Sequence, residues 1–144
     1  MTQPPPPGYG GPPPPYQPPP GGMSPGDERT WASAAHWTAL VAAFVAMAFL
    51  GPLLVLLVKG NSSPWVRRHA VESLNFQLSM LIYGLVGTVL GVILAILTFG
   101  LGLLLLIPLV LAFGAYWLIM TIIGAIKTGN GEDYRYPLTL RMVS

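Results

Sequence analysis

The chain has 144 residues, of which 53% are hydrophobic and only 8% charged, and its formal net charge is +2. A soluble domain usually carries about 25% charged residues, so this chain has too few to cover itself with a solvated surface. The composition therefore predicts an integral membrane protein in contact with the lipid bilayer. The small net charge excludes a nucleic-acid partner, and a sequence without cysteine excludes disulfides and thiolate chemistry.

The N-terminal tail, residues 1–27, is rich in proline and glycine. Residues 1–26 hold 12 of the 16 prolines, and such a segment cannot bury enough apolar surface to offset the entropy of ordering it. We predict a disordered tail with local polyproline II structure. Two roles remain open for it: docking of a protein partner through spacing such as Pro12 to Pro15, or a solubilising spacer.

The first hydrophobic segment covers about residues 31–58. Residues 30–58 carry no charge, and a continuous helix of this length would be about 43 Å long, against a hydrocarbon core of ~30 Å. Either the helix is steeply tilted, or it breaks near Gly51-Pro52, where proline removes a backbone hydrogen bond. The sequence thus predicts three or four hydrophobic helices. We favour the break, which would place the N-terminus on the same side as Lys59.

Two further hydrophobic segments follow, at about residues 74–97 and 103–126, within the uncharged stretch 73–126. The intervening "TFGLG", residues 98–102, is the only plausible turn, because its glycines break a helix. The first of these spans carries small residues that permit close approach of another helix. We therefore predict helix packing, within the chain or in a homo-oligomer, through Gly84, Gly87 and Gly91.

The charged stretch before residue 74 predicts an interfacial amphipathic helix. Ser63 suits a helix cap and Pro64 the first helical position, and the helix should continue into the 74–97 span. Basic residues near span ends mark the cytoplasmic side, so we expect the 59–72 loop and the C-terminus to be cytoplasmic in a bacterial plasma membrane. The residues after 127 should leave the membrane. The predicted cytoplasmic anchors are Lys59, Arg67, Arg68 and Lys127.

Polar residues continue from this helix into the second span. Glu72, Asn75 and Ser79 recur on one helical face, and Gln77 lies beside them. Burying such groups unpaired costs several kcal/mol, so they should face other helices, and we expect His36 to contact Asn75 or Glu72. This candidate polar cluster either only fixes helix packing or forms a small polar site for an ion or a lipid headgroup.

No catalytic or metal motif is visible. The sequence contains no His-Glu-x-x-His, no Ser/His/Asp set and no phosphate loop, and its only histidines are His36 and His69. We predict a protein that is not an enzyme and uses no cofactor or metal.

Three stretches resemble a known membrane family: "ERTWASAAHW", "GPLLVLLVKGNSSPWVRRHAVESLNFQ" and "GEDYRYPLTLRMV". They are similar to a family named only as a domain of unknown function. That family is grouped with the magnetosome membrane proteins MamF and MmsF and, more distantly, with the Tic-type import subunit of the chloroplast inner envelope. The resemblance covers residues 28–143 and implies a bundle of three or four hydrophobic helices, but no reaction.

Two hypotheses for function follow. The first is a structural or assembly protein, because a small-residue face and a Pro-rich tail both suit association. The alternative is a pore or translocation component resembling the Tic-type import subunit. It would need a polar path through the bundle, lined by the candidate polar cluster.

Overall fold

The computed structural model describes residues 22–43 and 47–144. Residues 1–21 of the N-terminal tail lie outside the described residues, and the prediction of disorder there remains a prediction. The prediction was wrong for residues 25–27, which form the first turn of a helix. The described chain forms four helices and no strand, which confirms the all-α fold class. Their bounds are α1 Pro25–Ala43, α2 Leu50–Lys59, α3 Pro64–Leu97 and α4 Leu103–Gly129.

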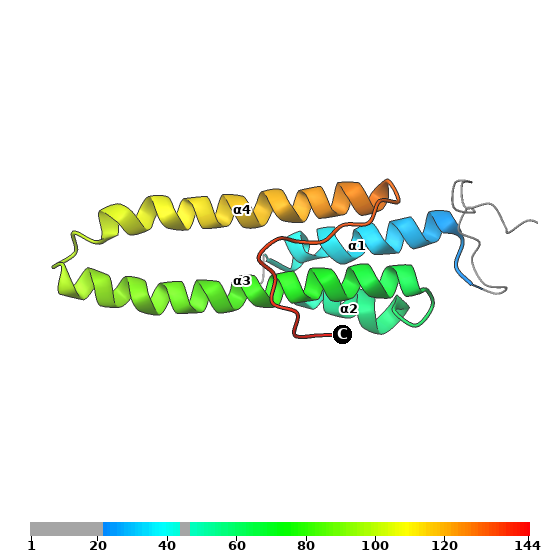
Figure 1. Ribbon diagram of the computed structural model, residues 1–144, viewed down its shortest axis with the longest axis horizontal. Coiled ribbons are helices and arrows are strands. Elements are labelled where there is room, and N and C mark those ends of the chain that lie inside the picture. The colour runs from blue at the N-terminus through cyan, green and yellow to red at the C-terminus, as the bar shows by residue number, and fades with distance from the viewer. Residues whose placement is uncertain (1–21, 44–46) are drawn as a thin grey trace, which may run out of the picture.

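The molecule is elongated, with two distinct ends (Figure 1). Helices α3 and α4 form a long antiparallel pair, and α1 and α2 lie against only one end of it. We call this end the head: it comprises α1, α2, residues 64–80 of α3, residues 113–129 of α4 and the C-terminal segment, residues 130–144. The remaining part, residues 81–112, is the apolar hairpin. Helix α1 contacts the three other helices and so occupies the centre of the head.

The first hydrophobic segment is broken into two helices. α1 ends at Ala43 and α2 begins at Leu50, so the break comes just before Gly51-Pro52. Pro52 lies in the first turn of α2, where its missing N–H removes no helical hydrogen bond. α1 and α2 run in opposite directions, and α1 starts at the same end of the molecule at which α2 stops (Figure 1).

α1 and α2 approach each other closely at Gly51. A Cβ atom at this position would clash with the backbone of Thr38 and Ala39. Small residues also line the inner face of α1, where Ala32, Ala35 and Ala39 are fully buried. The head is therefore packed through small side chains, as in other membrane helix bundles.

α3 begins at the residue that the sequence indicated. Ser63 has an extended backbone, and its Oγ accepts hydrogen bonds from the backbone N–H groups of Trp65 and Val66. The same hydroxyl donates to Oε1 of Glu28 at 2.6 Å, which ties the start of α1 to the start of α3. As expected, the amphipathic helix continues into the 74–97 span: it forms the first turns of an unbroken 34-residue α3.

The turn at residues 98–102 joins α3 to α4 at the far end of the hairpin. Phe99 and Gly100 have positive φ angles, of 51° and 89°. Such a backbone is strained for most side chains and natural for glycine, which explains why a Gly-containing stretch ends the helix here.

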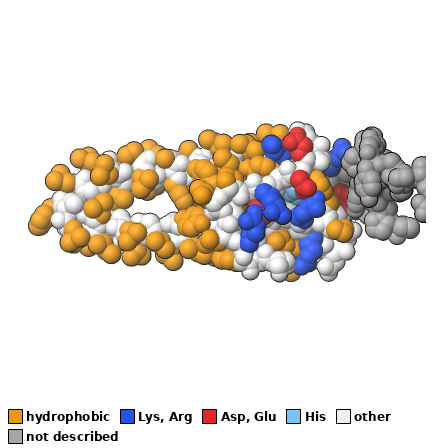
Figure 2. Space-filling model, in the orientation of Figure 1, with side chains coloured by type: hydrophobic (Ala, Val, Ile, Leu, Met, Phe, Trp, Pro, Cys, Tyr) orange, Lys and Arg blue, Asp and Glu red, His pale blue; other side chains and the backbone are white. Residues whose placement is uncertain are grey.

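Charge and apolar surface are divided between the two ends (Figure 2). The apolar hairpin exposes large side chains all along its length, such as Leu85, Leu97 and Leu104, which are 66%, 73% and 72% exposed. The charged side chains gather at the head. By length and composition, α3 and α4 are the two described helices able to cross a membrane.

Candidate functional site

The polar stripe of α3 binds the C-terminal segment. Beyond the end of α4 the chain folds back and runs antiparallel to α3, so that Leu138 lies at Tyr83, Leu140 at Ser79 and Ser144 at Arg67. That the residues after 127 leave the membrane stays a prediction. In the structure, the segment lies along the head as an extended strip without helix or strand.

Asn75 is the centre of this contact. Its Oδ1 accepts hydrogen bonds from the backbone N–H groups of Met142 at 2.9 Å and Val143 at 2.7 Å. Its Nδ2 donates to the backbone carbonyl of Val143 at 2.8 Å. One amide side chain thus pairs with three backbone groups of an extended segment, much as a neighbouring strand would.

Glu72 and Ser79 extend the same pattern in both directions. The N–H of Tyr136 donates to Oε1 of Glu72 at 2.9 Å, and Arg141 Nη2 lies 3.7 Å from the same oxygen. The N–H of Leu140 donates to Oγ of Ser79 at 2.9 Å. The three stripe residues therefore satisfy backbone donors of the segment, which would otherwise be unpaired against the bundle.

His36 contacts the C-terminal segment too. Its Nδ1 lies 2.7 Å from the hydroxyl of Tyr136, which is 3% exposed. Burial, with a further contribution from Tyr134, raises the pKa of Tyr136 well above its usual value. The phenol is thus protonated at neutral pH, and it donates to Nδ1 in the tautomer of His36 that carries its proton on Nε2. The ring of Tyr136 also stacks on Phe76, with centroids 3.9 Å apart.

This geometry corrects one expectation. We expected His36 to contact Asn75 or Glu72 directly, helix to helix. The structure instead places the C-terminal segment between them, so that His36 binds its Tyr136 hydroxyl while Glu72 and Asn75 bind its backbone. The polar residues do meet in one region, but their partner is an extended segment and not another helix.

Gln77 points to a different partner. Its Oε1 accepts a hydrogen bond of 2.6 Å from the indole N–H of Trp117 on α4. Its Nε2 is buried and makes no hydrogen bond. Gln77 is thus the one member of the candidate polar cluster that bridges two helices of the described chain directly by its side chain.

The predicted anchors all lie at the head. Arg68 forms an ion pair of 2.9 Å with Asp133, and Lys127 lies 3.6 Å from Glu132, so both bind the C-terminal segment. Arg67 donates to the backbone carbonyl of Ser144 at 3.0 Å. Lys59 lies over the ring of Trp31, 5.1 Å from its centroid. Three of the four anchors therefore also hold the segment in place.

The predicted small-residue face lines a groove of about 700 Å³ between the two helices of the apolar hairpin. Gly84, Gly87 and Gly91 all border it. A Cβ at Gly91 would lie 3.2 Å from Leu106, whereas a Cβ at Gly87 would meet no atom within 4 Å. The face is therefore turned toward α4 but only partly covered by it.

Residues 22–43 and 47–144 contain no group of three or more His, Asp or Glu side chains placed to hold a metal ion. The site that the geometry does show is a structural one: hydrogen bonds, an aromatic stack and ion pairs hold one segment onto a helix bundle. These contacts position the backbone of the C-terminal segment.

Sequence reasoning missed three residues of this site: Tyr136, His69 and Trp117. His69 is 1% exposed, and its ring lies 5.8 Å from that of His36. The available signal was the aromatic and polar "DYRYP" after the last helix. Such a cluster suits a buried contact as well as a headgroup anchor.

Comparison with known proteins supports the family that the three stretches suggested. No characterised protein and no solved structure is significantly similar to the chain. The model of one family, MamF/MmsF, described as the magnetosome magnetite crystal formation protein family, matches residues 27–143. This match covers α2, α3, α4, α1 from residue 27, and the C-terminal segment up to residue 143. The chain therefore belongs to the MamF/MmsF magnetosome magnetite crystal formation protein family.

Proposed function

We propose that this protein is a non-catalytic membrane assembly protein, which self-associates through the open face of its apolar hairpin. One observation carries the proposal: the groove beside Gly87 is lined by small and apolar residues and is not filled by the chain itself. The head, by contrast, is packed and internally hydrogen-bonded, so it serves as a rigid base for the hairpin.

The physical argument concerns packing in lipid. Apolar side chains gain little from leaving lipid for another apolar surface, so helices associate there through close van der Waals contact and small residues. Gly87 and Thr88 offer such a surface, since neither brings a bulky side chain into the groove. A helix from a second copy fits this chemistry, because the same hairpin supplies both the small face and the complementary leucines of α4.

The head fits the cytoplasmic side of the membrane. Arg67 and Arg68 at the start of α3 and Lys127 at the end of α4 lie in the head, and basic residues near span ends favour the cytoplasmic side. The family name supports a location in a magnetosome-type membrane. It also supports a role in crystal formation, which the protein would exert by organising that membrane. Docking of a protein partner by residues 1–27 also belongs to the proposal, supported by their composition alone.

The described residues give no separate support for the alternative function, a pore or translocation component. Its polar lining would come from the candidate polar cluster, but Glu72, Asn75 and Ser79 are hydrogen-bonded to the C-terminal segment. We therefore favour the assembly role.

Self-association is tested with Gly87→Leu in native membranes or nanodiscs. The structure leaves open space at Gly87, so the monomer should fold normally while association weakens roughly tenfold or more. Cross-linking and single-molecule counting measure the oligomer. Ala112→Leu is the matched control, because Ala112 is exposed on the hairpin and does not line the groove. A monomeric wild-type protein, or an oligomer indifferent to Gly87→Leu, would refute the proposal.

A further inference from the structure

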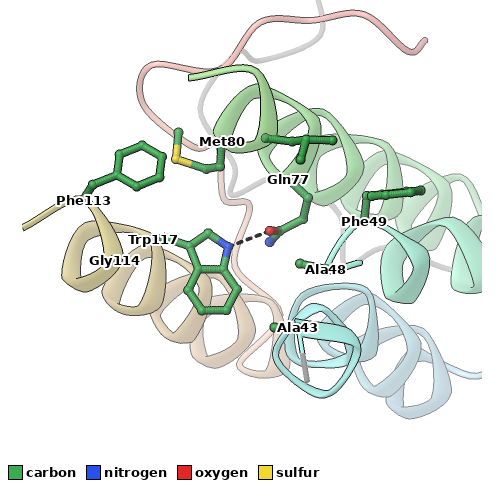
Figure 3. Close-up of a pocket in the computed structure, with 9 residues that line it drawn as sticks. Ala43, Ala48, Phe49, Gln77, Met80, Phe113, Gly114 and Trp117 are labelled. Carbon is green, nitrogen blue, oxygen red and sulfur yellow. Dashed lines mark hydrogen bonds between the residues drawn. The ribbon is translucent and has the colours of Figure 1, made fainter. Parts of the chain in front are cut away.

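A second cavity lies at the junction of head and hairpin (Figure 3). It is an open crevice of about 280 Å³, near the lower end of the ~300–1,000 Å³ typical of ligand pockets. Its walls are apolar, from Phe49, Met80, Leu81, Phe113 and Trp117, together with two alanines at the facing ends of the α1–α2 connection. The one strongly polar side chain on the wall is Gln77.

The orientation of the Gln77 amide is fixed by its neighbour. The indole N–H of Trp117 is a donor only, so it must face the amide oxygen, and the observed 2.6 Å contact is with Oε1. The opposite orientation would bring two donors together. The NH₂ group is therefore held away from Trp117. Gln77 lines the crevice, and its Nε2 is buried beneath the crevice surface.

This NH₂ group lacks a partner. Gln77 is only 3% exposed, and its Nε2 makes no hydrogen bond within residues 22–43 and 47–144. A buried amide donor without a partner is unfavourable. The crevice thus combines an apolar wall with one unsatisfied donor, which suits an apolar molecule that carries a single hydrogen-bond acceptor.

The depth of Gln77 in the membrane indicates which class of apolar molecule fits the crevice. It lies five residues, about 8 Å along the helix, beyond Glu72, the last charged residue of α3. From Gln77 to the turn at residues 98–102, α3 extends for ~30 Å, the thickness of the hydrocarbon core. With that turn at one boundary of the hydrocarbon, Gln77 lies at the other. The ester groups of phospholipids lie at the same level.

We propose that the crevice binds one phospholipid of the head-side leaflet, with its ester carbonyl accepting a hydrogen bond from Nε2 of Gln77. The adjoining acyl chain lies against the aromatic wall of Phe113 and Phe49. This lipid site is separate from the groove at Gly87 and does not depend on self-association.

Ester- and ether-linked lipids provide the test, because they differ in the carbonyl alone. The full chain is placed in nanodiscs of phosphatidylethanolamine with either linkage and the same chains, then stripped in detergent, and retained lipid is counted by native mass spectrometry. The ester lipid should be retained roughly fivefold better. Equal retention of the two lipids overturns the proposal.

Two variants test whether the preference for the ester lipid depends on Gln77. Gln77→Leu should abolish the preference for the ester lipid. Met80→Leu is the matched control: it changes another wall residue at similar volume without removing a polar group, and it should keep the preference. A preference that survives in Gln77→Leu also overturns the proposal.

A measurement on the unmodified protein tests the same hydrogen bond without depending on the folding of a variant. The chain has three glutamines, Gln3, Gln17 and Gln77, so selective ¹⁵N labelling gives three side-chain amide signals. Exchange of ester for ether lipid should move the Gln77 signal and leave those of Gln3 and Gln17 unchanged. An unmoved Gln77 signal would show that water or no ligand occupies the crevice.

Discussion

Asn75 shows at the scale of one residue why polar groups are tolerated inside this bundle. It is 1% exposed, and an unpaired amide at such a position would be strongly unfavourable. Its three hydrogen bonds to the C-terminal segment remove this penalty and give the segment its register. Asn75 thus serves as a binding point for the non-helical backbone of the C-terminal segment, whose polar groups need partners where protein buries them.

Replacement of Asn75 by leucine should release the C-terminal segment. The backbone N–H groups of Met142 and Val143 would lose their acceptor, at a cost of about 2 kcal/mol. Hydrogen exchange at these two amides, measured in detergent micelles, should become faster by more than tenfold.

Thr88→Ala is the control for this experiment. The Thr88 hydroxyl donates only to Gly84 within its own helix, at 2.8 Å, so exchange at residues 142 and 143 should be unchanged. Normal protection of both amides in Asn75→Leu would contradict the role assigned to Asn75.

Tyr136 makes the stability of the head sensitive to alkaline pH. Burial raises its pKa above the usual value of about 10. Above pH 10 the unfolded chain therefore releases this proton while the folded chain retains it. Since the unfolded state then binds fewer protons, the free energy of unfolding falls as pH rises, by about 1.4 kcal/mol per pH unit.

The measurement is denaturant unfolding in micelles between pH 9 and 12. Tyr136→Phe removes the phenol and keeps the ring that stacks on Phe76, so the slope should become shallower in this variant. Below pH 9 the contribution of Tyr136 to the slope vanishes, because the phenol is neutral in both states. An identical slope in the variant would show that Tyr136 ionises freely in the folded protein.

At the scale of elements, the short α1–α2 pair distinguishes this bundle from one in which every helix crosses the membrane. α2 has ten residues, about 15 Å of helix and half of a hydrocarbon core. It can be this short because α1 and α3 cover its inner face, where Gly51, Pro52 and Val55 are buried. The pair is thus a packing element of the head and not two complete crossings.

Gly51→Ala should destabilise the head by about 1–3 kcal/mol. The added methyl group meets the backbone of Thr38 and Ala39, and backbone yields less readily than a side chain. Unfolding in mixed micelles measures the loss, with Gly26→Ala as control, since a Cβ there meets nothing closer than 3.9 Å. Equal stability of the two variants would exclude the close approach.

At the scale of the whole molecule, polarity runs along the long axis. The start of α1, the 60–63 loop and the end of α4 lie at one end, and the 98–102 turn lies at the other (Figure 1). The charged head beside an uncharged hairpin fits one membrane boundary crossing the molecule near the junction. We therefore propose an even number of crossings, with the start of α1 and the end of α4 on the same side of the membrane.

Cysteine labelling tests this topology directly, because the sequence contains no native cysteine. Gly26→Cys and Asn61→Cys should react with a membrane-impermeant reagent from the same side, and Leu101→Cys from the other. The chosen residues are exposed, so substitution should leave the fold intact. Labelling of positions 26 and 61 from opposite sides would require a full crossing by the first hydrophobic segment, contrary to the structure.

The sequence alone determined the helical class, the turn at 98–102, the cap at Ser63 and the membrane character. These features depend on local composition and on the chemistry of single turns, which neighbouring residues define. It also singled out Glu72, Asn75, Gln77 and Ser79 as polar groups in need of partners, because burial of an amide or carboxylate is unfavourable in any fold.

Only the tertiary structure decided what those partners are. Asn75 and Val143 are 68 residues apart in the sequence, and His36 and Tyr136 are 100 apart. No local pattern encodes such pairings. An extended segment without periodicity carries no signal for the surface it binds, since its affinity comes from backbone groups that every residue has. Gly87 and Gly91 differ for the same reason. Both have the spacing of a packing face, but in the structure Leu106 covers Gly91 and leaves Gly87 open.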